Sequence, residues 1–427
     1  MLSTEDNELL CRTGPGTPMG ELFRRFWLPA LLPSELPRPD GDPIRVRILG
    51  EDLIAFRDTN GQVGFLANNC PHRGASLFFG RNEEGGLRCV YHGWKFDVSG
   101  QCVDMPNEPA ESNFRTKVRA KAYAAAEFGG LIWIYMGPEN KRPPAPAYQW
   151  TTQRDAAQAR INKWIQDSNY SHGLEGNIDS SHVAFLHSTL SQPMFRQNGN
   201  VSSSPQRMTA LDTEFGYVYG ARRDSPEGQF YWRVTTFVLP SFSNIASKSR
   251  WGEGFFIVPV DDHHHYWFAI NPSTRPDLAR RPASNPGMLR EITDPTQGLI
   301  PGTFRHIRNK DNDYLIDREM QRTYNYAGMP AYSPVQDKCV TESMGELYDR
   351  TQERLGVADT AIIHWRRLML RMVRQFQQGI EPAVLHEPSR FRAIPLDAVN
   401  GEAEFQRVWA AHHGEFQRDA GLAGATA

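Results

Sequence analysis

Four residues in two short segments have the types and spacing of metal ligands. Cys70-Pro-His72 is followed, after 16 intervening residues, by Cys89-Val-Tyr-His92, so each segment offers one thiolate and one imidazole. Two thiolates and two imidazoles suit tetrahedral zinc. They also suit a [2Fe-2S] cluster in which one iron binds both thiolates and the other binds both imidazoles. Because zinc fingers usually keep cysteines together and histidines together, the mixed order favours the cluster.

A second group of candidate ligands lies in Glu175-Gly-Asn-Ile-Asp179-Ser-Ser-His182-Val-Ala-Phe-Leu-His187. We predict a helical stretch over about 163–190, which places both histidines on a helix. They are five residues apart, slightly more than one helical turn, so a small irregularity lets both imidazoles face one metal. Two histidines and a carboxylate on one side of an iron leave the other side open for O2. A histidine pair alone is more often structural than metal-binding. The Cys and His residues of the first group, in the same chain, favour the metal-binding interpretation here.

The residues around both groups resemble those of the ring-hydroxylating Rieske non-haem iron oxygenases. Cys70-Pro-His-Arg-Gly-Ala75 and Cys89-Val-Tyr-His-Gly-Trp94 are similar to the two Rieske loops of these enzymes and their ferredoxins. The pattern Asp179-x-x-His182-x4-His187 is similar to the iron motif of the oxygenase α subunits. Residues 7–20 and 336–345 resemble the phthalate dioxygenase branch, so the resemblance covers nearly the whole chain.

The resemblance implies that a [2Fe-2S] cluster is held by four residues: Cys70, His72, Cys89 and His92. Rieske proteins of respiratory complexes carry an extra cysteine in each loop and commonly a serine that donates to the cluster. At those positions this chain has other residues: Ala75, Tyr91 and Trp94. Fewer hydrogen bonds to the cluster sulfurs predict a potential toward the low end of the Rieske range, which suits delivery of electrons to an oxygen-activating iron.

The resemblance also implies a mononuclear iron bound by His182, His187 and Asp337. Asp337 lies 150 residues after His187, in a Gln336-Asp337 segment that matches the ligand segment of the family. Three other carboxylates are its rivals: Asp311, Asp313 and Asp317.

By the same resemblance, Asp179 does not bind iron. It is expected to bridge His182 of one subunit and His92 of the neighbouring subunit. A buried aspartate that accepts from both imidazoles would hold their tautomers and link the two metal sites across a subunit interface. The alternative is an aspartate that merely supports His182.

The implied protein is a terminal oxygenase subunit that uses O2 and NADH-derived electrons to cis-dihydroxylate an aromatic carboxylic acid of the phthalate or benzoate type. Oxidative O-demethylation of a methoxylated aromatic acid uses the same metal sites and is the alternative. A Rieske electron-transfer protein and a zinc-bound structural protein are the non-enzyme alternatives. The resemblance implies a separate NADH-dependent flavin and iron-sulfur reductase as partner, and a homotrimer or stacked hexamer.

The expected architecture is α+β. Period-two apolar alternation at 44–48 and Asn60-Gly61 between two apolar runs predict antiparallel strands, whereas the proline-rich segment 141–146 predicts a linker. We therefore expect an N-terminal helical arm (1–27), a Rieske domain (28–142) and a catalytic domain (147–427). Strands are expected near 217–221, 231–239, 254–259 and 265–271, and helices over about 339–378. The resemblance implies a helix-grip-like catalytic domain with a curved antiparallel sheet.

Composition excludes several other classes of function. The 427 residues carry a net charge of -2 with a pI of about 6.7, so overall charge does not attract the protein to nucleic acid or anionic lipid. No apolar run approaches the roughly 20 residues of a spanning helix, and the acidic first residues lead us to expect a cytoplasmic protein. Five scattered cysteines, an odd number, argue against a disulfide framework.

An aromatic carboxylate would need a positive partner, and arginine suits its planar, bidentate geometry. The strands after residue 200 are expected to line the substrate site. They carry four candidates, of which the first is our assignment: Arg207, Arg223, Arg233 and Arg250.

Three further features of the sequence are given no functional role. Glu175 stands where many relatives have asparagine, and no role is assigned to it. The run His263-His264-His265 is predicted to face solvent, and His172 is predicted to be a packed helix residue.

Overall fold

The computed structural model describes residues 2–109, 111–152, 159–191, 206–246, 252–271, 298–330 and 334–419. The chain divides into two compact units. The smaller unit is Arg12–Pro146 with Val258–Asp262, and the larger unit is Met1–Cys11, Ala147–Ile257 and His263–Ala427.

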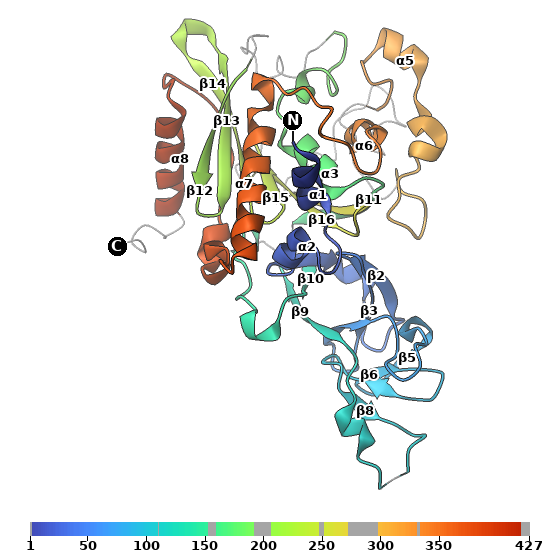
Figure 1. Cartoon of the computed structure of the whole chain (residues 1–427). Coiled ribbons are helices and arrows are strands. Elements are labelled where there is room, and N and C mark those ends of the chain that lie inside the picture. Colours follow the sequence, from blue (N-terminus) through green and yellow to red (C-terminus); the bar gives the residue numbers. More distant parts are fainter. Residues whose placement is uncertain are drawn as a thin grey trace. The chain divides into compact units, whose positions relative to one another are not determined.

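The smaller unit is built from two antiparallel sheets that follow a short helix, α2 (Pro18–Phe23). One sheet has the order β1-β10-β9-β4-β3-β2 and the other the order β5-β6-β7-β8. Figure 1 draws the strands of this unit in blue to teal. The strands are Trp27–Leu31 (β1), Ile44–Ile48 (β2), Glu51–Arg57 (β3), Val63–Ala67 (β4), Arg81–Glu83 (β5), Gly86–Arg88 (β6), Lys95–Phe96 (β7), Cys102–Asp104 (β8), Ala122–Phe128 (β9) and Leu131–Tyr135 (β10). The predicted strand at 44–48 and the hairpin at Asn60-Gly61, which joins β3 to β4, are confirmed.

The larger unit is organised around one sheet with the order β11-β17-β16-β15-β14-β13-β12, and β18 pairs with β14. The strands are Arg160–Gln166 (β11), Arg207–Thr213 (β12), Gly216–Asp224 (β13), Phe230–Val238 (β14), Phe242–Ile245 (β15), Glu253–Pro259 (β16), His265–Asn271 (β17) and Leu396–Asn400 (β18). The four strands that the sequence predicted in this region are therefore confirmed. The antiparallel sheet with covering helices also confirms the predicted α+β class.

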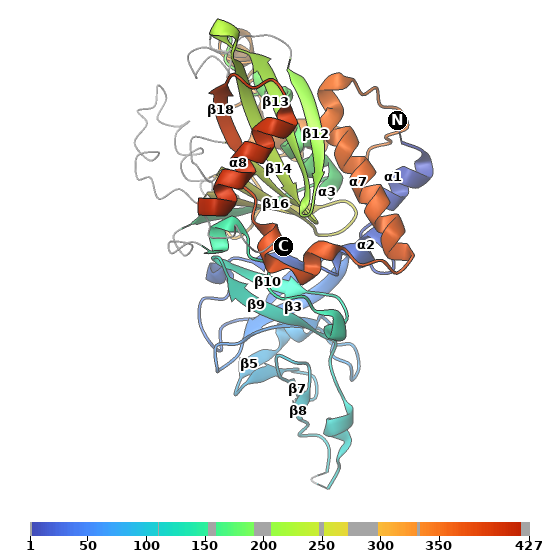
Figure 2. The same cartoon turned by 90° about the vertical axis from the view of Figure 1, so that its left-hand side faces the viewer.

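Helices cover both faces of this sheet. The helices of the larger unit are Thr4–Cys11 (α1), Tyr170–Ile178 (α3), Arg318–Thr323 (α5), Pro334–Ser343 (α6), Thr360–Gln377 (α7) and Phe405–Asp419 (α8). Figures 1 and 2 show α8 on one side of β12–β14 and α7 on the other. Side-chain contacts support this placement of the two helices. Trp232 stacks on Phe405 of α8, whereas the Tyr217 hydroxyl donates to the Ala361 carbonyl of α7.

Two sequence-based expectations are wrong in this unit. The helix predicted from about residue 163 begins only at Tyr170, because residues 160–166 form β11 and pair with β17 at the sheet edge. His265 does not face solvent: it is fully buried, and its ring lies between the Ser168 carbonyl and the indole N–H of Trp267. Both differences arise because β11 and β17 pair with each other in the sheet. The local periodicity of a sequence does not predict such pairing between distant segments. His172 is buried in α3, as predicted.

Candidate metal centres

The two loops of the smaller unit have the same backbone conformation. In the first, the Gly74 amide donates to the Cys70 carbonyl at 2.9 Å, and in the second the Gly93 amide donates to the Cys89 carbonyl at 3.0 Å. Both glycines have positive φ, 77° and 78°, a conformation that side chains with a Cβ rarely adopt. Each turn therefore presents a cysteine and a histidine from one tight loop.

In these loops the two cysteine thiols lie together and the two histidine rings lie together. The Cys70 and Cys89 thiols are neighbours and each cysteine is only 2% exposed, while the centroids of the His72 and His92 rings lie 4.5 Å apart. Burial, together with the neighbouring thiol of Cys89, raises the pKa of Cys70 to about 11. Two buried thiols can become thiolates side by side only next to a cation. The arrangement fits a cluster in which one iron takes both thiolates and the other takes both imidazoles.

Neighbouring aromatic residues hold the imidazoles in place. Trp94 stacks on His72 with ring centroids 4.3 Å apart, and its indole N–H donates to the Asn107 side-chain oxygen at 2.7 Å. The Tyr91 ring packs 3.9 Å from His92. Tyr91 is 54% exposed, so the imidazole side of the loops lies at the surface whereas the thiol side is buried.

The second candidate centre follows α3 in the larger unit. The Asn169 side chain caps the start of α3, and Asp179 ends it. The Asp179 carboxylate then accepts from the backbone amide and the hydroxyl of Ser181, both at 2.6 Å. These bonds turn the chain into a short 3-10 segment, His182–Ala184. The irregularity that the five-residue histidine spacing required is therefore present.

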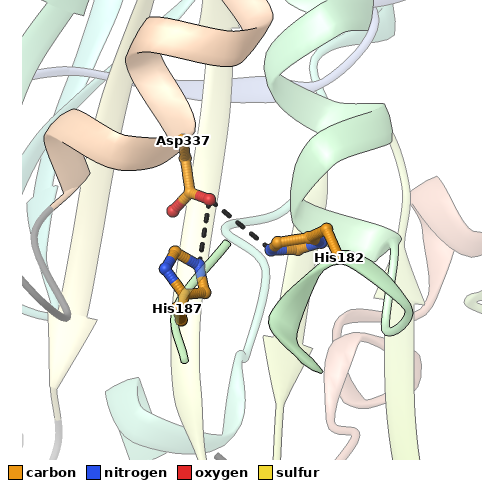
Figure 3. A group of neighbouring side chains, drawn as sticks. All are labelled: His182, His187 and Asp337. Carbon is orange, nitrogen blue, oxygen red and sulfur yellow. Dashed lines mark ion pairs between the residues drawn. The ribbon is translucent and has the colours of Figure 1, made fainter. Parts of the chain in front are cut away.

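Three predicted ligands from two segments converge here (Figure 3). One ligand atom from each of His182, His187 and Asp337 lies within 4.8 Å of the others. Nε2 of His187 is 3.0 Å and Nε2 of His182 is 3.5 Å from the same Asp337 oxygen. Asp337 comes from α6, which packs against α3. Two imidazoles and one carboxylate are the donor set of non-haem iron sites that keep open positions.

The outer nitrogens of both histidines face polar partners. His187 Nδ1 donates to the side-chain oxygen of Gln336 at 2.7 Å, and the Gln336 amide donates to the Met329 carbonyl at 3.3 Å, which orients the amide. His182 Nδ1 lies 3.4 Å from the Asp179 carboxylate. Burial lowers the pKa of His187, but the hydrogen bond and charge of Asp337 outweigh it and raise that pKa overall. Such partners leave both Nε2 atoms for a metal.

The rival carboxylates have other positions. Asp317 caps α5 by accepting from the Met320 amide at 2.9 Å. Asp311 is an exposed side chain 3.8 Å from Arg305. Asp313 lies in the irregular segment Lys310–Leu315. Within the described residues, the structure brings only Asp337 to the two histidines.

Sequence reasoning missed the residues that anchor α3. Glu175 is ion-paired with Arg350 at 3.0 Å and with Arg366 at 2.7 Å, and both arginines are buried. Although burial alone would raise it, these two charges lower the pKa of Glu175 to about 2. Arg350 and Arg366 lie more than 170 residues away from Glu175 in the sequence. No local sequence pattern therefore links these three residues, and the cluster could not be predicted from the sequence.

Iron-sulfur loops together with a two-histidine, one-carboxylate trio define the class of Rieske non-haem iron proteins. Family models agree: residues 26–122 match the Rieske [2Fe-2S] domain, and residues 134–422 match the LigXa C-terminal domain like family.

Curated relatives extend the match over the whole chain. The chain is 37% identical to the phthalate 4,5-dioxygenase oxygenase subunit of Pseudomonas putida, over 96% of both chains. It is 34% identical to the 3-chlorobenzoate-3,4-dioxygenase oxygenase subunit of Comamonas testosteroni, over 92% of this chain and 93% of that one. It is 30% identical to the 5,5'-dehydrodivanillate O-demethylase oxygenase subunit of a Sphingobium strain, over 96% and 90%.

Solved structures show the same fold. Dicamba monooxygenase bound to dicamba matches with a TM-score of 0.56 and 19% identity, covering 84% of this chain and 99% of that one. The chain belongs to the Rieske non-haem iron oxygenases, as an oxygenase α subunit with a [2Fe-2S] cluster and non-haem iron. It is therefore an enzyme, and the electron-transfer and zinc-protein alternatives are wrong. Among the described residues, no helix is long and apolar enough to cross a membrane.

Proposed function

We propose that this oxygenase cis-dihydroxylates an aromatic carboxylic acid of the phthalate or benzoate type. The observation that carries the proposal is the convergence of His182, His187 and Asp337 on one point of the larger unit. Two relatives that match more than nine tenths of this chain are named for dioxygenation of phthalate and of 3-chlorobenzoate. Oxidative O-demethylation is the second candidate, supported by the 30% identical O-demethylase subunit.

The residues that would hold the cofactors are those already grouped by geometry: Cys70, His72, Cys89 and His92 for the cluster, and His182, His187 and Asp337 for iron. When bound, these groups supply the electron transfer and the O2 activation of the reaction. The protein's own part is positioning. Gln336 keeps the proton on Nδ1 of His187 and aims Nε2 at Asp337, and no side chain is required to act as a separate acid or base.

We further propose that Asp179 links His182 to His92 of the partner subunit in a head-to-tail homotrimer, which could stack into a hexamer. Its support is the position of Asp179, 3.4 Å from His182 Nδ1 with a side chain 17% exposed. Large apolar side chains are exposed near each end of this route: Tyr91 (54%) beside His92, and Phe185 (69%), which packs 5.9 Å from Tyr326 (50%). Such surfaces favour burial against another subunit.

Electrons need an external donor, and we propose an NADH-dependent flavin and iron-sulfur reductase. A solved neighbour with a TM-score of 0.57 is an oxygenase in reduced complex with a ferredoxin. This neighbour supports an electron-transfer protein as the immediate partner. We place the enzyme in the cytoplasm, where NADH is available.

Oxygen uptake tests the proposed reaction. Iron-loaded protein is supplied with NADH and a phthalate-type reductase, and a panel of aromatic acids is screened with product analysis. Stimulated uptake with a cis-diol product is the expected result. Formaldehyde and a phenol would establish the O-demethylase instead. With both iron sites full, failure of every aromatic acid to stimulate uptake would contradict both proposals.

A further inference from the structure

The register of the sheet separates the arginines that the sequence offered for substrate binding. Arg207 on β12 pairs with Arg222 on β13, so both project from the same face. The Arg222 guanidinium lies 4.5 Å from the Phe230 ring centroid and donates to the Ala403 carbonyl at 2.7 Å. This is the face that α8 covers, through Phe405 on Trp232. Arg207 is therefore on the face opposite α7 and α3, and its substrate role stays a prediction. Arg250 lies outside the described residues.

Arg233 projects from the other face, next to the metal trio. It pairs with Ala221 and lies on the same side of β14 as Phe237, whose register partner is Ser243. Ser243 in turn hydrogen-bonds Asn177 of α3. The Arg233 guanidinium donates to the Ser180 hydroxyl at 3.4 Å, one residue after Asp179.

Arg223 shares this face but is already bound within the fold. Its guanidinium donates to the Gln206 side-chain oxygen at 2.6 Å, and the residue is 5% exposed. Burial lowers its pKa to about 10. Arg233 is half-buried instead, and its one described hydrogen bond is the long contact to Ser180. Of the two, Arg233 has the guanidinium that a ligand can reach.

Two carboxylates lie on the same face. Asp397, which is exposed, is the register partner of Arg233 on β18, and the second carboxylate is that of Glu253. Glu253 opens β16 and pairs with Ile245, two residues from Ser243, so it projects to the same side as Arg233. Its side chain is solvent-accessible, yet surrounding protein raises the pKa of the carboxyl, and the Arg233 charge offsets only part of that rise. Within the described part of the chain, no hydrogen bond or ion pair reaches its carboxylate. An accessible carboxylate on this face can accept a hydrogen bond from a donor group of a ligand.

We propose that Arg233 and Glu253 form a bipolar substrate subsite, with Arg233 binding an anionic group and Glu253 accepting a hydrogen bond from a hydroxyl or N–H group of the same substrate. The inference rests on the proposed function and narrows its substrate class to aromatic acids that also carry a donor. A site built to bond a polar group discriminates strongly against analogues that lack it, because its own groups are then left unpaired.

Calorimetric binding to the full-length, metal-loaded protein without O2 tests the subsite apart from turnover. The probes are benzoate, the three hydroxybenzoate isomers and phenol. Wild-type protein should bind at least one hydroxybenzoate more tightly than benzoate. Arg233→Gln should weaken binding of both acids roughly 10- to 100-fold and leave phenol unchanged, because a charged hydrogen bond is lost. Glu253→Gln should remove the preference for the hydroxyl while benzoate binding stays the same.

Matched controls come from α5, where Arg322 and Glu319 form an exposed pair; Arg322→Gln and Glu319→Gln should bind every probe as wild type does. Arg233→Lys and Glu253→Asp keep the charges and should restore part of the preference if the first variants fold poorly. Unchanged selectivity in folded Arg233→Gln and Glu253→Gln, or loss of acid binding in Arg207→Gln or Arg223→Gln instead, would overturn the inference. Selective binding of hydroxybenzoates without stimulated oxygen uptake would uphold the subsite and overturn the proposed reaction.

Discussion

Each loop of the smaller unit places a cysteine and a histidine within four residues, whereas the trio of the larger unit needs Asp337 from 150 residues beyond His187. The loops turn on Gly74 and Gly93 and need little beyond their own backbone bonds. The trio depends on how α3 packs against α6. The first centre is therefore a local structure, and the second is a tertiary one. Perturbing the helices of the larger unit should damage the second centre and spare the first.

Removing the distant ligand should have the largest effect. Asp337→Ala leaves two imidazoles without their carboxylate, so mononuclear iron should be lost and turnover should fall roughly 100-fold or more. The cluster should remain, because none of its ligands changes. Iron analysis, the visible spectrum of the cluster and oxygen uptake measure the three quantities. The rival Asp311→Ala serves as control and should retain both iron and turnover.

The next effect concerns the link between the two centres. Asp179→Asn keeps the size and hydrogen-bonding ability of the side chain but removes its charge beside His182. Both metals should stay, while steady-state turnover should fall on the order of 10- to 100-fold. Stopped-flow reoxidation of the reduced cluster with substrate and O2 should slow by the same factor. Normal reoxidation would leave Asp179 as a support for His182 only.

The anchor of α3 should affect stability more than chemistry. Glu175→Gln leaves the buried Arg350 guanidinium without its carboxylate, whereas Arg366 keeps its ion pair with Glu353. Leaving a buried charge without its partner costs about 3–5 kcal/mol. Thermal unfolding should show the loss, and mononuclear iron should be released at lower temperature than the cluster signal disappears. Simultaneous loss of both signals would contradict the distinction between a local and a tertiary centre. Glu319→Gln on exposed α5 is the matched control.

Acid should act on the larger unit through two buried histidines near α3. Burial lowers the pKa of His172 to about 4 and that of His265 to about 3, from an ordinary 6.5. The unfolded chain therefore binds protons first, and stability is lost as pH falls from about 6.5 toward 4, by about 1.4 kcal/mol per pH unit for each group.

Thermal melts between pH 7 and pH 5 measure this slope. His265→Gln should flatten it, whereas His386→Gln, at an exposed position, should not. An unchanged slope in His265→Gln would show that other groups dominate the acid sensitivity.

Sequence spacing together with the family resemblance predicted the ligands of the first centre, and sequence patterns predicted several strands of the two units. The loop ligands are adjacent in the chain, and turn glycines with alternating apolar residues encode local geometry directly. The spacing of the histidine pair suggested a metal site, but the pair was assigned to iron only together with the first centre and the family resemblance. Asp337 could be named only through family resemblance, because no local pattern distinguishes it from Asp311 or Asp317.

Tertiary structure decided the rest. Residues 160–166 are a strand because β17 offers an edge to pair with. Glu175 has a function because two distant arginines meet it in the core. Arg207 and Arg233 are chemically identical in the sequence, and only the register of β12, β13 and β14 places them on opposite faces. Sequence determines chemistry and short-range geometry, but which groups meet depends on packing between segments that are far apart in the chain.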